Sequence, residues 1–155
     1  MTREELMREA IRLSSESVAN GGGPFGAVVA RGSEIIATGA NRVTRDNDPT
    51  AHAEVEAIRE ASKVLGSFDL SGCEIYTSCE PCPMCLGAIY WAHLDHIYYG
   101  NNRAAAKAVN FDDSFIYGQI AIDPAERSIK AESLLSEEAI EVFKKWQNKE
   151  DKIKY

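Results

Sequence analysis

Apolar residues recur at helical spacing near both ends of the chain, which predicts an amphipathic helix at each end. The first helix follows Thr2, which forms a capping box with Glu5, and it ends at the glycines of positions 21–23. The last helix follows Ser136 as its cap and carries an apolar stripe made of Ala139, Ile140, Val142, Phe143 and Trp146. Both helices should bury these faces against other parts of the protein.

Two further helices are predicted in the middle of the chain. One covers residues 50–64, with Thr50 as its cap and Gly66 as its stop. The other has Pro83 at its first position, which proline tolerates, and runs to about Trp91. A short alanine-rich helix is also expected further on, at 103–109.

Short runs of apolar and β-branched residues between the helices predict strands. The first two runs are joined by a tight turn and should form a β-hairpin. Strands are expected at 25–30, 34–38, 73–78, 96–99 and 128–132. Strands that alternate with helices in this way favour a layered α/β domain, an open sheet with helices on both faces.

Chain length and charge limit the organisation and the partners. With 155 residues, of which 45% are hydrophobic, the chain is expected to form one domain over residues 1–155. Its formal net charge of -7 makes the surface repel phosphate groups, so a nucleic-acid partner is disfavoured. No apolar run is long enough for a signal peptide or a membrane span, which predicts a cytoplasmic protein without a membrane partner.

Cysteine spacing indicates a metal site rather than disulfides. Three of the four cysteines, Cys79, Cys82 and Cys85, fall within seven positions. A C-x-x-C pair alone could also be a thiol redox pair or half of a structural zinc site. Cys79 has the same spacing to Cys82 as Cys82 has to Cys85, but strand alternation places Cys79 on one face with Cys73, where a core thiol is the favoured role.

The motif His52-Ala53-Glu54 adds a third metal ligand and a carboxylate to the two cysteines. One imidazole and two thiolates are donors that zinc prefers, and three protein ligands leave one coordination position open for water. We therefore predict one zinc ion per subunit, bound by His52, Cys82 and Cys85 at the starts of two helices. Glu54 lies within reach of that open position and can act as general acid and base. It could also be a surface glutamate whose negative charge interacts favourably with the helix dipole.

These segments together resemble the cytidine deaminase-like superfamily of zinc deaminases, whose signature is H-x-E followed by P-C-x-x-C. Within it, they are most similar to the bacterial guanine deaminases, especially in residues 23–28, 79–89 and 111–117. The resemblance implies a three-layer α/β/α fold with a central mixed sheet of about five strands. It also implies hydrolysis of guanine to xanthine and ammonia, in purine catabolism or salvage.

The same resemblance implies a set of substrate contacts. Asp113 would accept hydrogen bonds from the two adjacent donors of guanine or from the departing amine, although periodicity alone cannot separate it from Asp112. Asn41 would bind the purine, unless it only forms a turn. The backbone N–H near Ala53 would help to position the adduct. A planar base also needs apolar faces, for which Phe25, Trp91 and Tyr155 are candidates, although aromatic residues at such positions are more often part of the core.

The resemblance further implies a homodimer in which a C-terminal segment, about 135–155, is exchanged so that its last residues close the partner's pocket. The apolar stripe of the last helix is compatible with such an exchange, and equally with packing inside one subunit.

Two alternatives remain open at this stage. The enzyme could deaminate guanosine, cytidine or tRNA adenosine by the same chemistry. A protein of another class, a non-catalytic zinc-binding interaction module, would need a fourth protein ligand on the metal.

Overall fold

The computed structural model describes all residues 1–155 and forms two compact units, residues 1–113 and residues 114–155. None of the helices is both long and apolar enough to cross a bilayer.

The first unit is built around one mixed sheet of four strands in the order β2-β1-β3-β4. Its strands are β1 (Gly26–Arg31), β2 (Glu34–Ala40), β3 (Glu74–Cys79) and β4 (His96–Asn101). β1 pairs antiparallel with both β2 and β3, whereas β3 pairs parallel with β4. The parallel pair is joined by a helical crossover, as a parallel connection requires.

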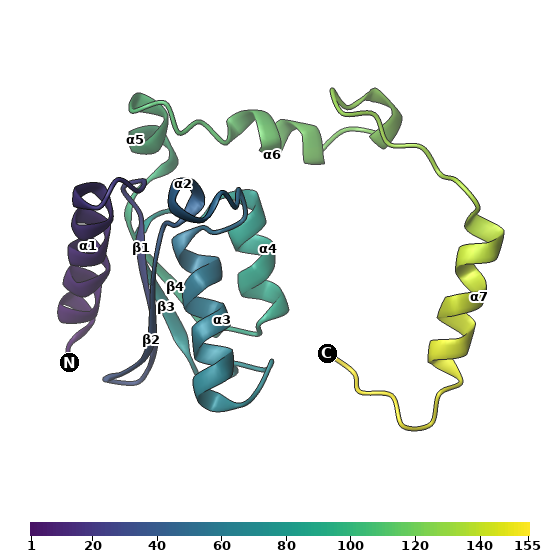
Figure 1. Cartoon of the computed structure of the whole chain (residues 1–155), viewed down its shortest axis with the longest axis horizontal. Helices are drawn as coiled ribbons and strands as arrows, with labels where there is room; N and C mark the ends of the chain where they lie inside the picture. Colours follow the sequence, from purple (N-terminus) through teal and green to yellow (C-terminus); the bar gives the residue numbers. More distant parts are fainter. The chain divides into compact units, whose positions relative to one another are not determined.

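Helices cover the sheet on two sides, which confirms the three-layer α/β/α class (Figure 1). On one face lies α1 (Arg3–Ala19), and the other carries α3 (Ala53–Leu65) and α4 (Pro83–Trp91). Successive residues of β3 point to opposite faces of the sheet. Ile75 belongs to the core under α3, and Tyr76 belongs to the core under α1.

Gly39 allows β2 and α3 to approach each other closely. A Cβ atom at this position would lie 2.2 Å from the carbonyl oxygen of Ala53 and 2.5 Å from the backbone nitrogen of Ala57. The first turn of α3 is therefore held against the sheet through a contact between backbones.

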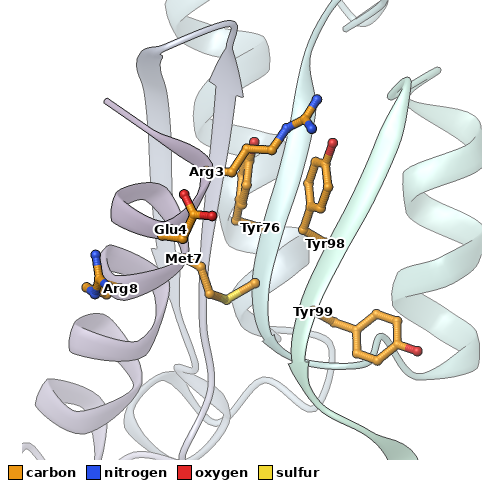
Figure 2. A pocket seen from close by; sticks show the side chains of 7 residues that line it. All are labelled: Arg3, Glu4, Met7, Arg8, Tyr76, Tyr98 and Tyr99. Carbon is orange, nitrogen blue, oxygen red and sulfur yellow. The ribbon is translucent and has the colours of Figure 1, made fainter.

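An open pocket lies between α1 and the β3–β4 edge of the sheet (Figure 2). It is lined by Arg3, Glu4, Met7, Arg8, Tyr76, Tyr98 and Tyr99. The rings of Tyr76 and Tyr98 stack with their centroids 4.7 Å apart, and the Arg3 guanidinium lies 5.1 Å from the centre of the Tyr98 ring. No residue of the predicted metal site lines this pocket.

The remaining short helices of the first unit are α2 (Val43–Asp46), which the sequence did not predict, and α5 (Arg103–Ala108), which it did. The second unit contains α6 (Ser114–Ile120), the short 3-10 helix η1 (Pro124–Glu126) and α7 (Ser136–Gln147).

Residues 128–132 form no strand, so the sheet has four strands rather than about five. A strand needs a hydrogen-bonded neighbour, and this segment pairs with no other. The predicted helix at 136 is present, but Ser136 is its first residue and not its cap. Leu135 takes the cap position in a left-handed conformation, with φ at 55°.

Candidate metal centre

The three predicted zinc ligands lie at the starts of α3 and α4. His52 is the N-cap residue of α3, and Cys82 is the N-cap residue of α4. Cys85 follows three positions after Cys82, one turn along, so both thiols lie on the same side of the helix start. The prediction that Thr50 caps α3 is wrong, since its backbone and hydroxyl donate instead to Asp48 at 2.8 and 2.7 Å.

The distances between these donor atoms suit a tetrahedral metal. His52 Nδ1 lies 3.5 Å from Cys82 Sγ and 3.5 Å from Cys85 Sγ, and all three donor atoms lie within 4.8 Å of one another. Zinc bonds of about 2.0 Å to nitrogen and 2.3 Å to sulfur at tetrahedral angles separate the two ligands by about 3.5 Å. The donor set and its spacing therefore fit zinc.

Electrostatics at the cluster favour a thiolate. Hydrogen bonds from Cys85, and then the His52 ring, lower the pKa of the Cys82 thiol to about 4. The pKa of Cys85 is raised, first by its hydrogen bond to Cys82 and then by burial. Zinc held through both sulfurs would require both thiols to lose their protons, which the surroundings of Cys82 favour.

Glu54 is buried beside the cluster, with only 5% of its surface exposed. Cys85 Sγ donates to its Oε2 at 3.2 Å, and the Thr77 hydroxyl donates to its Oε1 at 3.1 Å. Burial raises the pKa of this carboxyl group. A surface role for Glu54, the alternative considered from sequence, is wrong because the side chain is enclosed.

Cys79 and Cys73 are not part of the cluster. Both are buried free thiols, and burial raises the pKa of Cys79 to about 11, helped by the nearby carboxylates of Glu54 and Asp113. The donor atoms that lie within 4.8 Å of one another are those of His52, Cys82 and Cys85, and Cys79 is not among them. The cluster thus has three protein donors.

Two predicted substrate residues lie at the same end of the sheet. Asn41 directly follows β2 and is buried, and its backbone N–H donates to the carbonyl of Phe25 at 3.1 Å. Val43 N–H donates to Asn41 Oδ1 at 3.2 Å, which leaves the amide NH2 as the group available to a ligand. The Arg42 N–H donates to the Ala51 carbonyl at 2.9 Å and so ties this strand end to the residue before His52.

The two neighbouring aspartates differ in their surroundings. The Asp113 side chain is 16% exposed and pairs with Arg103 at 3.3 Å. Asp112 is 39% exposed and its carboxylate lies 3.8 Å from Lys107 Nζ. The Asp113 carboxylate also helps to raise the pKa of Cys79, so it lies near the end of β3.

The aromatic candidates are placed differently from one another. Phe25 is half-buried and packs edge-on against Phe111, with ring centroids 4.9 Å apart. Trp91 is 67% exposed at the last position of α4, about 13.5 Å along the helix from Cys82. Tyr155 is 75% exposed in the second unit. Within one subunit, the structure therefore brings Phe25 near the site and leaves Trp91 away from it.

Sequence reasoning missed Thr77 and Arg103 as neighbours of the site. Thr77 interrupts an otherwise apolar face of β3, between Ile75 and Cys79. A polar residue at a buried strand position is the signal that could have indicated a role. Arg103 opens an alanine-rich helix, and no local pattern singles it out.

Comparison with known proteins agrees with this geometry. Residues 1–101 match the family described as the cytidine and deoxycytidylate deaminase zinc-binding region. The guanine deaminase of Bacillus subtilis is 49% identical over 156 residues, covering 100% of both chains. The X-ray structure of guanine deaminase from that organism superposes on 100% of this chain and 99% of its own with a TM-score of 0.97.

Two more distant relatives share part of the chain. A structure of guanine deaminase from Nitrosomonas europaea is 34% identical, with a TM-score of 0.70 over 72% of this chain and 65% of that one. The tRNA-specific adenosine deaminase of Bacillus subtilis is 40% identical over 101 residues, which are 64% of this chain and 63% of that protein.

Proposed function

This chain belongs to the cytidine and deoxycytidylate deaminase zinc-binding family and, within it, to the guanine deaminases, and from that premise we propose that it hydrolyses guanine to xanthine and ammonia. The observation that carries the proposal is the 49% identity to a guanine deaminase over the whole chain. The three-donor metal cluster with a buried glutamate beside it supplies the chemistry that this reaction needs.

His52, Cys82 and Cys85 would hold the zinc ion, which would let water act as a nucleophile near neutral pH. Glu54 moves the protons, because its Oε2 faces the cluster. Its carboxylate takes a proton from the attacking water and passes it to a ring nitrogen as C2 becomes tetrahedral. It then takes the second proton from the new C2–OH and delivers it to the departing amine. The C2–N bond breaks as ammonia leaves, and the new C2–O bond becomes the carbonyl of xanthine.

The substrate is oriented by groups around this end of the sheet. The Asn41 amide donates to the purine, and the Asp113 carboxylate accepts from its N1–H and 2-amino groups or from the departing amine. The backbone N–H of Ala53 lies in the first turn of α3, where N–H groups have no partner within the helix, and it helps to position the adduct. The Phe25 ring offers an apolar face to the planar base.

The protein acts as a homodimer, with a C-terminal segment exchanged between subunits and Tyr155 closing the partner's pocket. This part of the proposal is supported by the second unit, in which no residue is buried although it carries Phe143 and Trp146. Such side chains need a covering surface. We place the enzyme in the cytoplasm, in agreement with its four free cysteines.

The test is ammonia release from the purified, zinc-analysed protein, with guanine, guanosine, cytidine and tRNA offered in parallel. We expect release from guanine, loss of activity on removal of zinc with a chelator, and recovery when zinc is returned. Release from tRNA alone would instead make the protein a tRNA adenosine deaminase, the function of its 40% identical relative. Zinc without any ammonia release would indicate a non-catalytic module.

A further inference from the structure

Thr77 is a hydroxyl group in a layer that is otherwise apolar. It lies on β3 with only 1% of its surface exposed, on the face that packs under α3. Its neighbours on that face of the strand are Ile75 and Cys79. A valine of similar shape would fill this space without the cost of burying a polar group. The buried hydroxyl is therefore expected to form hydrogen bonds that offset this cost.

The Thr77 hydroxyl has hydrogen-bond partners on β3 and on α3. The backbone N–H of Cys79 donates to Thr77 Oγ1 at 3.3 Å, which fixes the orientation of the hydroxyl against the strand. The hydroxyl proton can go to the Cys79 carbonyl or to Glu54 Oε1, which lies 3.1 Å away. A carboxylate is the stronger acceptor of the two.

The two oxygens of Glu54 therefore have different neighbours. Oε1 is held by Thr77, and Oε2 lies 3.2 Å from Cys85 Sγ at the metal cluster. Holding one oxygen fixes the rotation of the carboxylate plane, and this rotation determines where the other oxygen points. Side chains that act in proton transfer need such support from their neighbours.

We propose that Thr77 is a positioning residue, which holds Glu54 Oε1 so that Oε2 faces the reacting atoms at the metal site. This inference rests on the proposed function only for its kinetic readout. The orientation of Glu54 is a property of the folded protein and can be measured without any substrate.

The experiment compares Thr77→Val, which keeps the shape and removes the hydroxyl, with Thr77→Ser, which keeps the hydroxyl. We expect Thr77→Val to lower kcat on guanine by about ten- to a hundredfold, the size expected for a hydrogen bond to a charged group. KM and zinc content should stay close to those of the wild type, and Thr77→Ser should recover most of kcat. In a crystal structure of zinc-loaded Thr77→Val, the Glu54 carboxylate should rotate away while the zinc ligands keep their places.

The matched control is Ser78→Ala, which removes a buried hydroxyl from the same strand. Ser78 Oγ accepts from the Gly26 N–H at 3.0 Å and has no bond to Glu54, so its loss should lower Tm without a selective fall in kcat. Wild-type kcat in Thr77→Val, no recovery in Thr77→Ser, or an unmoved Glu54 carboxylate in the crystal would overturn the inference. Failure of the wild type to release ammonia from guanine would refute the proposed function alone, because the crystal structure still tests the position of Glu54.

Discussion

At the scale of single residues, the site depends on differences between side chains of the same type. Glu54 and Glu56 both belong to the first turn of α3, yet only Glu54 is buried against the metal ligands. The Glu56 side chain is 25% exposed and pairs with Arg59 at 3.0 Å. Burial and neighbours, more than residue type, therefore decide which carboxylate can handle protons.

Replacing Glu54 with glutamine should separate metal binding from catalysis. The amide keeps the size of the side chain but cannot carry protons between water and base, so kcat on guanine should fall by about two to four orders of magnitude. Zinc content should be unchanged, because Glu54 is not one of the three donors. Glu56→Gln is the control and should keep wild-type kcat; near wild-type activity in Glu54→Gln would refute the proton shuttle.

The aspartate pair offers a second comparison at this scale. Asp113→Ala should lower kcat/KM on guanine by about two orders of magnitude or more, since each hydrogen bond to a charged group contributes about 1.5–3 kcal/mol. The unfolding temperature should change little, because the Arg103 pair lies partly in solvent. Asp112→Ala, with its more exposed carboxylate, should behave like the wild type. Steady-state kinetics on both variants tests this assignment. A large loss of kcat/KM in Asp112→Ala, with little change in Asp113→Ala, would assign the role to Asp112.

At the scale of secondary structure, the site is a meeting of two helix starts at one end of the sheet. The sequence predicted both helices and the three donor residues that the structure brings within 4.8 Å of one another, because helix stops, proline positions and the P-C-x-x-C spacing are local signals. The exact start of α3 was missed, as Thr50 has the chemistry of a cap but is held by Asp48. The bond between Thr77 and Glu54 could not be read from the sequence, since it joins residues 23 positions apart.

The close approach of β2 and α3 makes a prediction for Gly39. A methyl group there would collide with backbone atoms of Ala53 and Ala57, which cannot turn aside as a flexible side chain can. Gly39→Ala should lower the free energy of unfolding by about 1–3 kcal/mol and lower Tm by roughly 3–10 °C. Because α3 carries His52 at its start, zinc should also bind more weakly.

Gly87→Ala is the matched control, measured by the same thermal unfolding and zinc titration. Gly87 lies within α4, and a Cβ atom there would meet nothing within 4 Å. Alanine favours a helix over glycine by up to about 1 kcal/mol, so this variant should be as stable as the wild type or more stable. Equal Tm values for Gly39→Ala and the wild type would show that the strand and helix can move apart freely.

At the scale of the whole molecule, both core clusters, one on each face of the sheet, lie in the first unit, and the second unit has no core. Residues 114–155 contain helices α6 and α7 but no buried side chain. A single domain over residues 1–155 therefore stays a prediction, as does the exchange of about 135–155. The sequence could not settle either point, because an amphipathic helix has the same pattern of apolar residues whether its apolar face packs within its own subunit or on a partner.

Mixing two impaired variants distinguishes an exchanged C-terminal segment from one that packs within its own subunit. One is Glu54→Gln, and the other lacks Tyr155, whose loss should lower activity by leaving the pocket open. If the C-terminal segment is exchanged, a mixed dimer contains one site with both an intact Glu54 and the partner's intact C-terminus. Random reassortment of the subunits should then restore about a quarter of the sites, because half of the dimers are mixed and each has one complete site.

The measurement is guanine turnover after the two variants are unfolded, mixed and refolded together, with each variant refolded alone as control. If each subunit closes its own pocket, every site in the mixture lacks one of the two groups. Activity would then stay at the level of the separate variants, and the exchange would be refuted even if the protein is a dimer.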